Sequence, residues 1–443
     1  MKNYFPWLYS RKYLFFQIFI ETIIFYLINH KLFNIEFSSF HVHIIYLFWI
    51  TFSYILGRYD LNEKNLILLV LKTVIKIFLL YLFLYPFVSF IFSTKNNFIS
   101  GGFQNANEYI NPFLVYIGFY QLLNASVFSL FRKKRKIWIF IGELEKYKQC
   151  LSIINEPTID NSLKNNFELR YFEISDNFTY KNVDGIILED EKFLNEKLSI
   201  NYFKSLDIKL YTLLEWCEII LQRYPVDLFL NRETELLNIK NDMKPIEQRI
   251  KRVAETIIAI FLILITSPMI ILMGIIIFLE DKGPIFYSQE RMGLYGKSFK
   301  ITKLRTMNIN AESGEPKWST KNDRRITKIG SLLRNLRIDE LPQLFSVIVG
   351  DMSLIGPRPE RSEINYKLEK VIPFYNERHK IKPGISGWAQ VNYPYGASIE
   401  DSKTKLSFDL YYLKNYSIFF DVLIFIKTLR LVSNAKGAIS TIK

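Results

Sequence analysis

Four long apolar runs at the start of the chain limit its fold more than any other feature of the sequence. Each run approaches the roughly 20 residues that an α-helix needs to cross the hydrocarbon core of a bilayer. The first run is short and contains Glu21, so its ends are the least well defined. The runs are Tyr13–Ile28, Phe40–Leu56, Val70–Phe92 and Ile110–Leu130.

Basic residues flank this region at its two ends. Lys2, Arg11 and Lys12 precede the first run, and residues 132–136 after the fourth run are all Lys or Arg. An even number of crossings with positive charge at both ends places both ends on the cytoplasmic side. We therefore predict a four-helix transmembrane bundle over residues 1–136. A buried soluble helical bundle is the alternative, but it would leave the charge distribution unexplained.

A fifth apolar run, Ile257–Leu279, differs from the others because a proline interrupts it. Basic residues lie on both of its flanks, so a single crossing cannot satisfy the preference for positive charge on the cytoplasmic side. Pro268 bends a helix, and the hydroxyl of Ser267 can donate to the carbonyl that the proline leaves without a donor. We predict a re-entrant helix over residues 250–280 that bends at Ser267 and Pro268. A kinked transmembrane helix is the alternative.

Residues 137–243 have the pattern of a soluble α/β domain. A β-rich run, Ile137–Ile141, is followed by Gly142 and a helical stretch to about Asn155. Two further apolar runs, 183–188 and 208–211, alternate with helical segments, which favours a small parallel sheet. Gly142 stands alone, without a G-x-G-x-x-G pattern, so a nucleotide site is weakly indicated. A docking or regulatory role for this domain stays open beside it.

Composition restricts the chemistry that residues 244–443 can perform. The chain has only two cysteines and four histidines, which excludes a disulfide framework, a cysteine-based zinc site and, over most of the chain, a histidine triad. Catalysis must therefore depend on carboxylates, Lys and Arg. The net charge of +14 favours anionic partners. Nucleic acid is disfavoured among these partners, because the basic residues gather at the ends of the predicted membrane helices and around one predicted phosphate-binding cluster.

That cluster centres on Asp339 and Glu340. Pro342 and the apolar residues after it predict the first turn of a helix, with Asp339 at or near its N-cap. The helix dipole and basic neighbours would then favour an ionised Asp339, which can attack phosphorus. Glu340 offers oxygen ligands for a Mg²⁺ that also holds a diphosphate. In the alternative interpretation Asp339 only caps a helix and Glu340 is solvated.

Basic residues elsewhere in the domain supply candidate phosphate clamps. Lys303 and Arg305 lie at the end of a predicted strand, Phe299–Leu304, and alternation would place both on one face. Arg358 lies between two prolines that restrict the backbone around its guanidinium. Near the C-terminus, apolar residues recur at helical spacing opposite Asp421, which suits an interfacial helix and a core helix equally.

The motifs of the C-terminal domain resemble those of the bacterial sugar transferases, the monotopic polyprenyl-phosphate glycosyl-1-phosphate transferases. They occur in the order found in that family. The four-span bundle and the α/β segment resemble the long form of the family, whose middle domain is Rossmann-like. One small variation is Arg337-Ile338, where other members often carry a small polar residue and Leu. The matching segments are Gly283–Arg291, Lys303–Met307, Arg337–Gln343, Gly350–Glu360 and Lys382–Asn392.

The resemblance implies an activity and a location. A UDP-sugar would give its sugar 1-phosphate to undecaprenyl phosphate, with UMP released, at the start of exopolysaccharide, capsule, O-antigen or glycan synthesis. Asp339 would be the nucleophile that carries the phospho-sugar, and Glu340 would bind Mg²⁺. The enzyme would be a multi-pass protein of the bacterial inner membrane, with inner-membrane lipids and a second copy of itself as partners and its catalytic domain on the cytoplasmic face. The substrate-binding or phosphate-binding residues would include Lys303, Arg334 and Arg358, with Arg305 beside them.

Two other functions are compatible with the same residues. A membrane-anchored sensor or scaffold would bind a ligand through its α/β domain without catalysis. A membrane-associated phosphohydrolase would use Asp339 to transfer a phosphoryl group to water. The acceptor distinguishes the hydrolase from the transferase, because only a transferase forms a lipid product.

Overall fold

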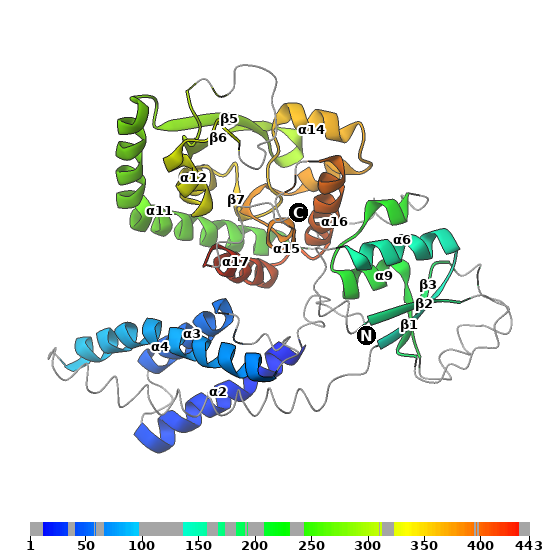
Figure 1. Cartoon of the computed structure of the whole chain (residues 1–443), viewed down its shortest axis with the longest axis horizontal. Helices are drawn as coiled ribbons and strands as arrows, with labels where there is room; N and C mark the ends of the chain where they lie inside the picture. Colours follow the sequence, from blue (N-terminus) through cyan, green and yellow to red (C-terminus); the bar gives the residue numbers. More distant parts are fainter. Residues whose placement is uncertain are drawn as a thin grey trace. The chain divides into compact units, whose positions relative to one another are not determined.

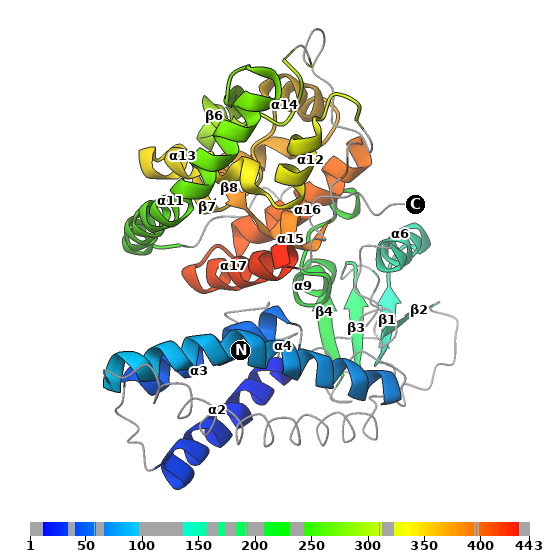
Figure 2. The ribbon, with the colours of Figure 1, turned by 60° about the vertical axis from the view of Figure 1, so that its left-hand side comes forward.

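The computed structural model describes residues 12–33, 40–56, 58, 66–96, 136–156, 167–172, 183–190, 193, 208–230, 243–309, 311, 323–393, 396 and 398–433. The chain divides into two compact units. One holds the N-terminal helices, and the other holds the α/β domain together with the C-terminal domain. Figures 1 and 2 show the elements of both units, which are described separately below.

The N-terminal unit contains three described helices, α2 (Lys12–Phe33), α3 (Phe40–Ile55) and α4 (Leu66–Asn96), which correspond to the first three apolar runs. The fourth run, Ile110–Leu130, lies outside the described residues. Glu21 does not interrupt α2, because it is buried and forms an ion pair with Arg58. The four-span bundle therefore stays a prediction. The core of the three helices consists of Phe25, Ile45, Trp49, Leu80, Leu84 and Val88.

The α/β domain forms a four-stranded sheet in the order β2-β1-β3-β4. β1 pairs in parallel with β3, and β3 pairs in parallel with β4, so the predicted parallel sheet is confirmed for these three strands. Consecutive apolar residues form β1 and β3, whose Ile139 and Ile186 lie in a buried core. The helix α6 (Leu144–Asn155) follows β1 directly. The strands are β1 (Lys136–Ile141), β2 (Phe167–Tyr171), β3 (Gly185–Leu188) and β4 (Lys209–Thr212).

The segment after β4 packs on the C-terminal domain. It contains α9 (Leu213–Trp216), a π-helix (Cys217–Leu221) and a 3₁₀ helix (Val226–Phe229). The backbone N–H of Tyr224 donates to the carbonyl of Ser407 over 2.8 Å, and Nε1 of Trp388 donates to the carbonyl of Gln222 over 2.9 Å. The α/β domain is thus anchored to the C-terminal domain through one buried segment.

The longest helix of the C-terminal domain, α11 (Pro245–Asp281), bends partway along its length, as Figure 1 shows. Pro268 lies inside it and cannot donate to the carbonyl of Leu264. The hydroxyl of Ser267 donates to that carbonyl over 2.9 Å. Among the described residues, α11 is the one helix that is long and apolar enough to cross a membrane. Its re-entrant course in a membrane stays a prediction.

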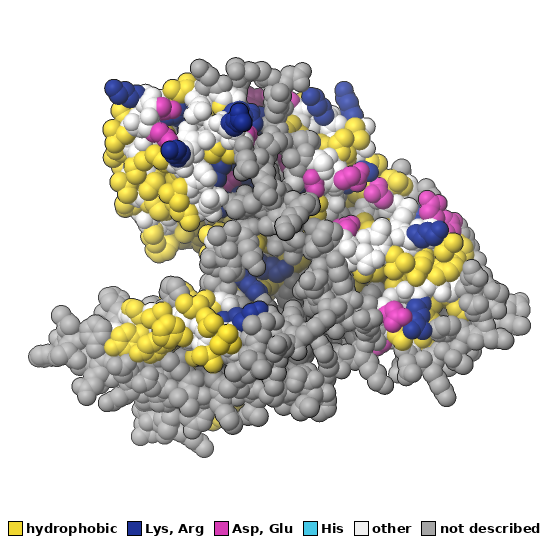
Figure 3. Space-filling model, viewed as in Figure 1, with side chains coloured by type: hydrophobic (Ala, Val, Ile, Leu, Met, Phe, Trp, Pro, Cys, Tyr) yellow, Lys and Arg dark blue, Asp and Glu magenta, His cyan; other side chains and the backbone are white. Residues whose placement is uncertain are grey.

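Apolar side chains of α11 face outward, and Figure 3 shows hydrophobic atoms gathered over this helix. Leu264 is 67% exposed, although it lies at the centre of the apolar run. Two inward-facing residues, Ala259 and Ile277, belong to two separate core clusters, one on each side of the bend. These clusters attach α11 to the rest of the domain, because their other members come from the elements described next.

The rest of the domain begins with an antiparallel pair, β5 (Phe286–Met292) and β6 (Ser298–Leu304). Ile301 and Leu304 of β6 pack into the two core clusters of α11. The parallel pair β7 (Ser353–Ile355) and β8 (Gly384–Ser386) lies further along the chain. The remaining helices of the described part of this domain are η5 (Leu294–Gly296), α12 (Lys328–Asn335), η6 (Ile338–Gln343), α13 (Leu344–Val349), α14 (Ser362–Glu369), η7 (Tyr375–Lys380), α15 (Trp388–Asn392), α16 (Ile399–Lys414) and α17 (Ile418–Ser433).

The two faces of α17 are arranged as the spacing predicts. Asp421 lies opposite the exposed apolar residues, and it is buried 2.7 Å from Nζ of Lys251 in α11. Phe419 is 72% exposed, whereas Phe420 is buried. The helix α17 therefore has an exposed apolar face and a buried face that contacts α11 through this ion pair.

Candidate functional site

A short 3₁₀ helix carries the two predicted carboxylates. This helix, η6, starts after Arg337, which has a left-handed backbone (φ 58°), and Ile338 fixes it by packing into the core. The sequence predicted Asp339 at or near the N-cap of an apolar helix. Asp339 lies in the first turn of η6, two residues after its N-cap Arg337, and the apolar α13 follows from Leu344. Its predicted position near a helix N-terminus is therefore confirmed, although this helix is a 3₁₀ helix.

Glu340 is held by three cationic side chains. Its Oε1 accepts hydrogen bonds from Nζ of Lys303 over 3.1 Å and from Nη2 of Arg358 over 2.6 Å. Its Oε2 lies 3.4 Å from Nη1 of Arg337. Burial alone would raise the pKa of Glu340, but Arg358, Lys303 and Arg337 hold this pKa well below its ordinary value. Glu340 is therefore ionised at neutral pH.

Asp339 has the opposite electrostatic character. It is only 7% exposed, and its Oδ1 has no hydrogen-bond partner among the described residues. Burial and the negative charge of Glu340 raise the pKa of Asp339 to about 6, although Lys303 and Arg334 act in the other direction. The expectation that its surroundings favour the ionised form is thus wrong. Asp339 is a poorly solvated carboxylate whose free oxygen has no competing donor within the described protein.

The structure brings three of the four predicted basic residues around this pair. Lys303 and Arg358 bind Glu340, and Arg334 lies close enough to lower the pKa of Asp339. Nε of Arg334 also donates to Oγ1 of Thr306 over 2.8 Å, which fixes its side chain. Arg305 is placed elsewhere.

Arg305 pairs with Asp281 at the end of α11, with Nη1 and Oδ2 2.7 Å apart. The alternation that would have put it beside Lys303 stops because β6 ends at Leu304. The prediction that both residues share one face is therefore wrong. The structure gives Arg305 a role in the turn after α11, where it lies against Gly283.

Sequence reasoning missed three residues of this region. Arg337 contacts Glu340 from a left-handed backbone, and no sequence pattern indicates that conformation for an arginine. Arg378 and Asp409 form a buried ion pair 2.8 Å long behind Arg358. Both come from elements far from Arg358 in the sequence, so no local signal could have connected them.

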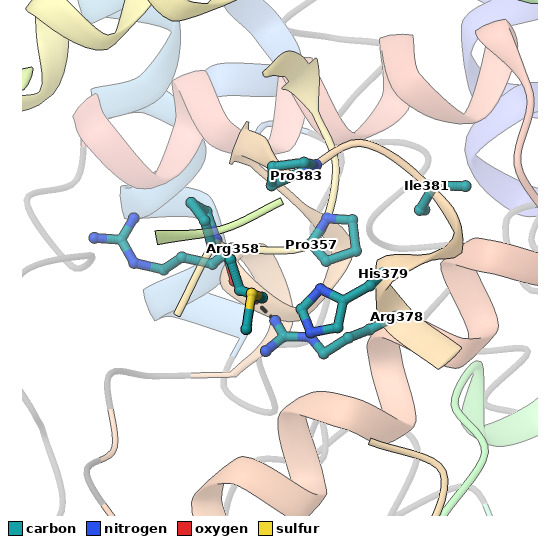
Figure 4. A pocket seen from close by; sticks show the side chains of 8 residues that line it. Pro357, Arg358, Arg378, His379, Ile381 and Pro383 are labelled. Atoms are coloured by element: carbon teal, nitrogen blue, oxygen red, sulfur yellow. Dashed lines mark hydrogen bonds between the residues drawn. The ribbon is translucent and has the colours of Figure 1, made fainter. Parts of the chain in front are cut away.

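A small pocket lies beside Arg358, and Figure 4 shows its lining. The side chain of Arg358 leads away from His379, while Nη2 of Arg378 donates to the carbonyl of Arg358 over 2.8 Å. Nε2 of His379 lies 3.0 Å from Oδ1 of Asn365. Burial and the charge of Arg378 lower the pKa of His379 to about 3, so this histidine is neutral at physiological pH. It has a packing role here, without acid–base chemistry near neutral pH.

A carboxylate of η6 suits a Mg²⁺ ion that is bound together with substrate phosphates. The described residues contain no group of three or more His, Cys, Asp and Glu side chains that could hold a metal. Mg²⁺ is often bound by one or two carboxylates together with substrate phosphates. Glu340, the metal ligand that the sequence predicts, could supply such a carboxylate, which leaves Oδ1 of Asp339 without a metal and, among the described residues, without a donor. The residues therefore suit a Mg²⁺ that arrives with a diphosphate, and they do not form a complete protein site.

Comparison with known proteins connects this site to a family. The family model of bacterial sugar transferases matches residues 246–435, which include the whole cluster. The chain is 43% identical over 194 residues to a UDP-N-acetylgalactosamine-undecaprenyl-phosphate N-acetylgalactosaminephosphotransferase of Aeromonas hydrophila. That match covers 44% of this chain and 46% of the relative, so the chain spans about half the length of this curated protein.

Two shorter relatives are covered more completely. A putative undecaprenyl-phosphate N-acetylgalactosaminyl 1-phosphate transferase of Bacillus subtilis is 50% identical over 129 residues, which are 29% of this chain and 72% of that protein. A UDP-glucose:undecaprenyl-phosphate glucose-1-phosphate transferase of Caulobacter vibrioides is 35% identical over 214 residues, 47% of this chain and 79% of that protein. With its C-terminal domain matched in this way, the chain belongs to the bacterial sugar transferase family.

Proposed function

We propose that this chain transfers a sugar 1-phosphate from a UDP-sugar to undecaprenyl phosphate and releases UMP. The observation that carries the proposal is the buried Oδ1 of Asp339, which has no hydrogen-bond partner among the described residues and lies beside a carboxylate surrounded by cations. The names of the relatives support the same reaction class. The resulting lipid-linked sugar would begin the synthesis of a polysaccharide or glycan.

The proposed reaction has two displacements at one phosphorus atom. Oδ1 of Asp339 attacks the phosphorus that carries the sugar, and the bond from that phosphorus to the oxygen bridging the two phosphates breaks, so UMP leaves with the electron pair. An oxygen of undecaprenyl phosphate then attacks the same phosphorus. The bond to Asp339 breaks, which regenerates the carboxylate. The covalent carrier keeps two mutually repelling phosphate anions from occupying the site together.

The side chains around Glu340 explain how an anionic donor would be accepted. Asp339 and Glu340 carry two negative charges, and Lys303, Arg334, Arg337 and Arg358 carry four positive charges, which leaves the cluster net positive. Guanidinium and ammonium groups that now bind Glu340 can bind phosphate oxygens with similar geometry. They would stabilise the charge that develops on the transferred group and on the leaving UMP.

Mg²⁺ would be held by Glu340 together with the donor phosphates, and it would neutralise charge on the diphosphate during transfer. The raised pKa of Asp339, about 6, leaves this side chain mostly ionised at neutral pH. Its burial removes water that would otherwise solvate the attacking oxygen. The chain's own residues thus provide a reactive carboxylate within a positively charged surround.

The outward-facing apolar residues of α11 support a membrane location for this chemistry. A helix that enters the cytoplasmic leaflet and bends at Pro268 would hold the cluster near the lipid headgroups, where the acceptor phosphate lies. We extend the proposal to an enzyme of the bacterial inner membrane with its C-terminal domain on the cytoplasmic face. The exposed Phe419 of α17 would add to the same membrane contact.

The test uses the full-length chain in lipid nanodiscs with Mg²⁺, undecaprenyl phosphate and a panel of UDP-sugars. We expect UMP release with at least one donor, a lipid-linked sugar product, and a phospho-sugar adduct on Asp339 in intact-mass and peptide analysis when the acceptor is omitted. Free sugar phosphate without a lipid product would favour the hydrolase. The absence of turnover and adduct with every donor would favour the sensor or scaffold.

A further inference from the structure

The segment that presents Arg358 is held in an unusual way. Pro357 and Pro359 have no backbone N–H, so the backbone of this segment offers three carbonyl acceptors and only one N–H donor, that of Arg358. Each of the three carbonyls accepts a hydrogen bond. The backbone N–H of Gly384 donates to the carbonyl of Pro357 over 2.9 Å, and Nη1 of Arg291 donates to the carbonyl of Pro359 over 3.1 Å. The carbonyl of Arg358 itself accepts from Nη2 of Arg378 over 2.8 Å.

Arg378 in turn is fixed by groups that lie behind it. Its Nη1 donates to the hydroxyl of Tyr375 over 2.8 Å, and its Nη2 lies 2.8 Å from Oδ2 of Asp409. The side chains of Arg378 and Asp409 are 4% and 2% exposed. Burying two charges is costly, and apolar residues of similar volume often serve stability as well or better. Stability alone therefore gives a weak reason for an ion pair here.

The contacts form one continuous path to the candidate site. Asp409 of α16 binds Arg378, Arg378 binds the carbonyl of Arg358, and the guanidinium of Arg358 binds Glu340 over 2.6 Å. We propose that Arg378 and Asp409 are positioning residues, which hold the Pro-Arg-Pro segment so that the guanidinium of Arg358 reaches Glu340 and the donor diphosphate. This inference rests on the proposed transferase function.

A double-mutant cycle on the full chain in nanodiscs tests the positioning role. Asp409→Asn keeps the shape of the side chain and removes its charge, and we expect kcat/KM for the UDP-sugar to fall about 10- to 100-fold, the range for a hydrogen bond to a charged group. In an Arg358→Gln background the same change should cost less than about threefold, because the group that it positions is already absent. Arg378→Lys, which keeps the charge but loses the planar donor fork, should behave in the same way.

The ion pair of Asp421 and Lys251 supplies a matched control. It is also buried and 2.7 Å long, but no hydrogen bond or ion pair described here joins it to Arg358. Asp421→Asn should reduce kcat/KM by the same factor in the wild-type and Arg358→Gln backgrounds. Thermal unfolding of every variant identifies losses that come from misfolding, and Arg378→Lys replaces Asp409→Asn if the latter does not fold.

Two results would overturn the proposal, and they can be told apart. If the wild-type chain is active but Asp409→Asn and Arg378→Lys cost the same factor with and without Arg358, the positioning roles are wrong and the transferase function stands. If the wild-type chain shows neither turnover nor adduct across the donor panel, the proposed function fails and the positioning roles fail with it.

Discussion

Two buried carboxylates in this chain accept hydrogen bonds from groups of the kind that bind phosphate, and these groups differ. In the α/β domain, Oε2 of Glu189 accepts a hydrogen bond from the backbone N–H of Glu143 over 2.7 Å, at the N-terminal end of α6. In the C-terminal domain, Glu340 accepts hydrogen bonds from the side chains of Lys303 and Arg358. The first carboxylate is bound by a fixed backbone donor and the second by side chains that can move.

The turn before α6 is already occupied by the carboxylate of Glu189, whereas the cations around Glu340 could also bind an incoming anion. The end of a helix with free N–H groups attracts phosphate, but here the carboxylate of Glu189 occupies that position, and Glu145 adds a negative charge to the first turn. Gly142 is needed for the same reason: an added Cβ would lie 2.4 Å from Oε2 of Glu189. The glycine makes room for a protein side chain, which argues against the nucleotide site that the sequence weakly indicated.

The largest expected effect contrasts one acid from each region. Asp339→Asn should reduce UMP release by about 10³-fold or more, because the proposed nucleophile is lost. Glu189→Gln should leave the rate within about twofold, since the amide oxygen can still accept from Glu143. Steady-state UMP release by the two full-length variants in nanodiscs measures both effects. Substantial turnover by Asp339→Asn would contradict the covalent route, and a large loss in Glu189→Gln would place part of the site in the α/β domain.

A smaller effect is expected from the cations. Arg358→Gln removes a charged hydrogen bond to Glu340 and a proposed phosphate contact, so kcat/KM for the donor should fall about 10- to 100-fold. Arg170→Gln provides the control, because Arg170 is exposed in the α/β domain and its ion pair among the described residues is with Glu168 of its own strand. Donor titrations of both variants give the ratio. Equal losses would show that general positive charge matters more than the position of Arg358.

The sequence was sufficient for features that depend on local pattern. The strand Ile137–Ile141 and the helix after it appear within about one residue of their predicted bounds, because continuous apolar runs and a glycine mark them. Ser267 and Pro268 lie within α11, which is bent, and the predicted hydrogen bond from the hydroxyl of Ser267 to a freed backbone carbonyl is present. Lys303 meets Glu340 because the alternation of β6 directs it toward η6.

Features that depend on tertiary structure could not be obtained in this way. Arg305 departs from the cluster because a strand ends one residue earlier than the alternation required. Burial raises the pKa of Asp339, whereas the basic residues near it in the sequence indicated a lowered pKa. Asp409 meets Arg378 across a long sequence separation, and Asp421 is buried because Lys251 of α11 supplies the opposite charge. Each case depends on a partner that only the fold identifies.

The pH dependence of adduct formation sharpens the contrast between the two carboxylates of the cluster. With a pKa of about 6, Asp339 becomes protonated as the pH falls through 6, so the rate should drop about tenfold per pH unit below that value. Glu340 stays ionised over this range because its pKa is lowered. Burial also lowers the pKa of Lys303, so activity should fall at a less alkaline pH than an ordinary lysine would give.

Rapid quenching of the reaction without lipid acceptor isolates this step, since the titration of undecaprenyl phosphate then has no influence. A rate that stays constant from pH 7.5 to about pH 5 would contradict an Asp339 nucleophile with a raised pKa.

The smallest expected effect lies at the turn of the α/β domain. Gly142→Ala should destabilise this domain by about 1–3 kcal/mol, because the new methyl group overlaps Glu189 and weakens its bond to Glu143. Hydrogen exchange in peptides from β1 and β3 should become faster, while the donor KM stays within about twofold. In a Glu189→Gly background the methyl group should cost less, since the atoms that it meets first are gone. If the donor KM rises tenfold while hydrogen exchange in β1 and β3 is unchanged, the turn contacts the nucleotide sugar. The α/β domain and the C-terminal domain would then both bind the donor.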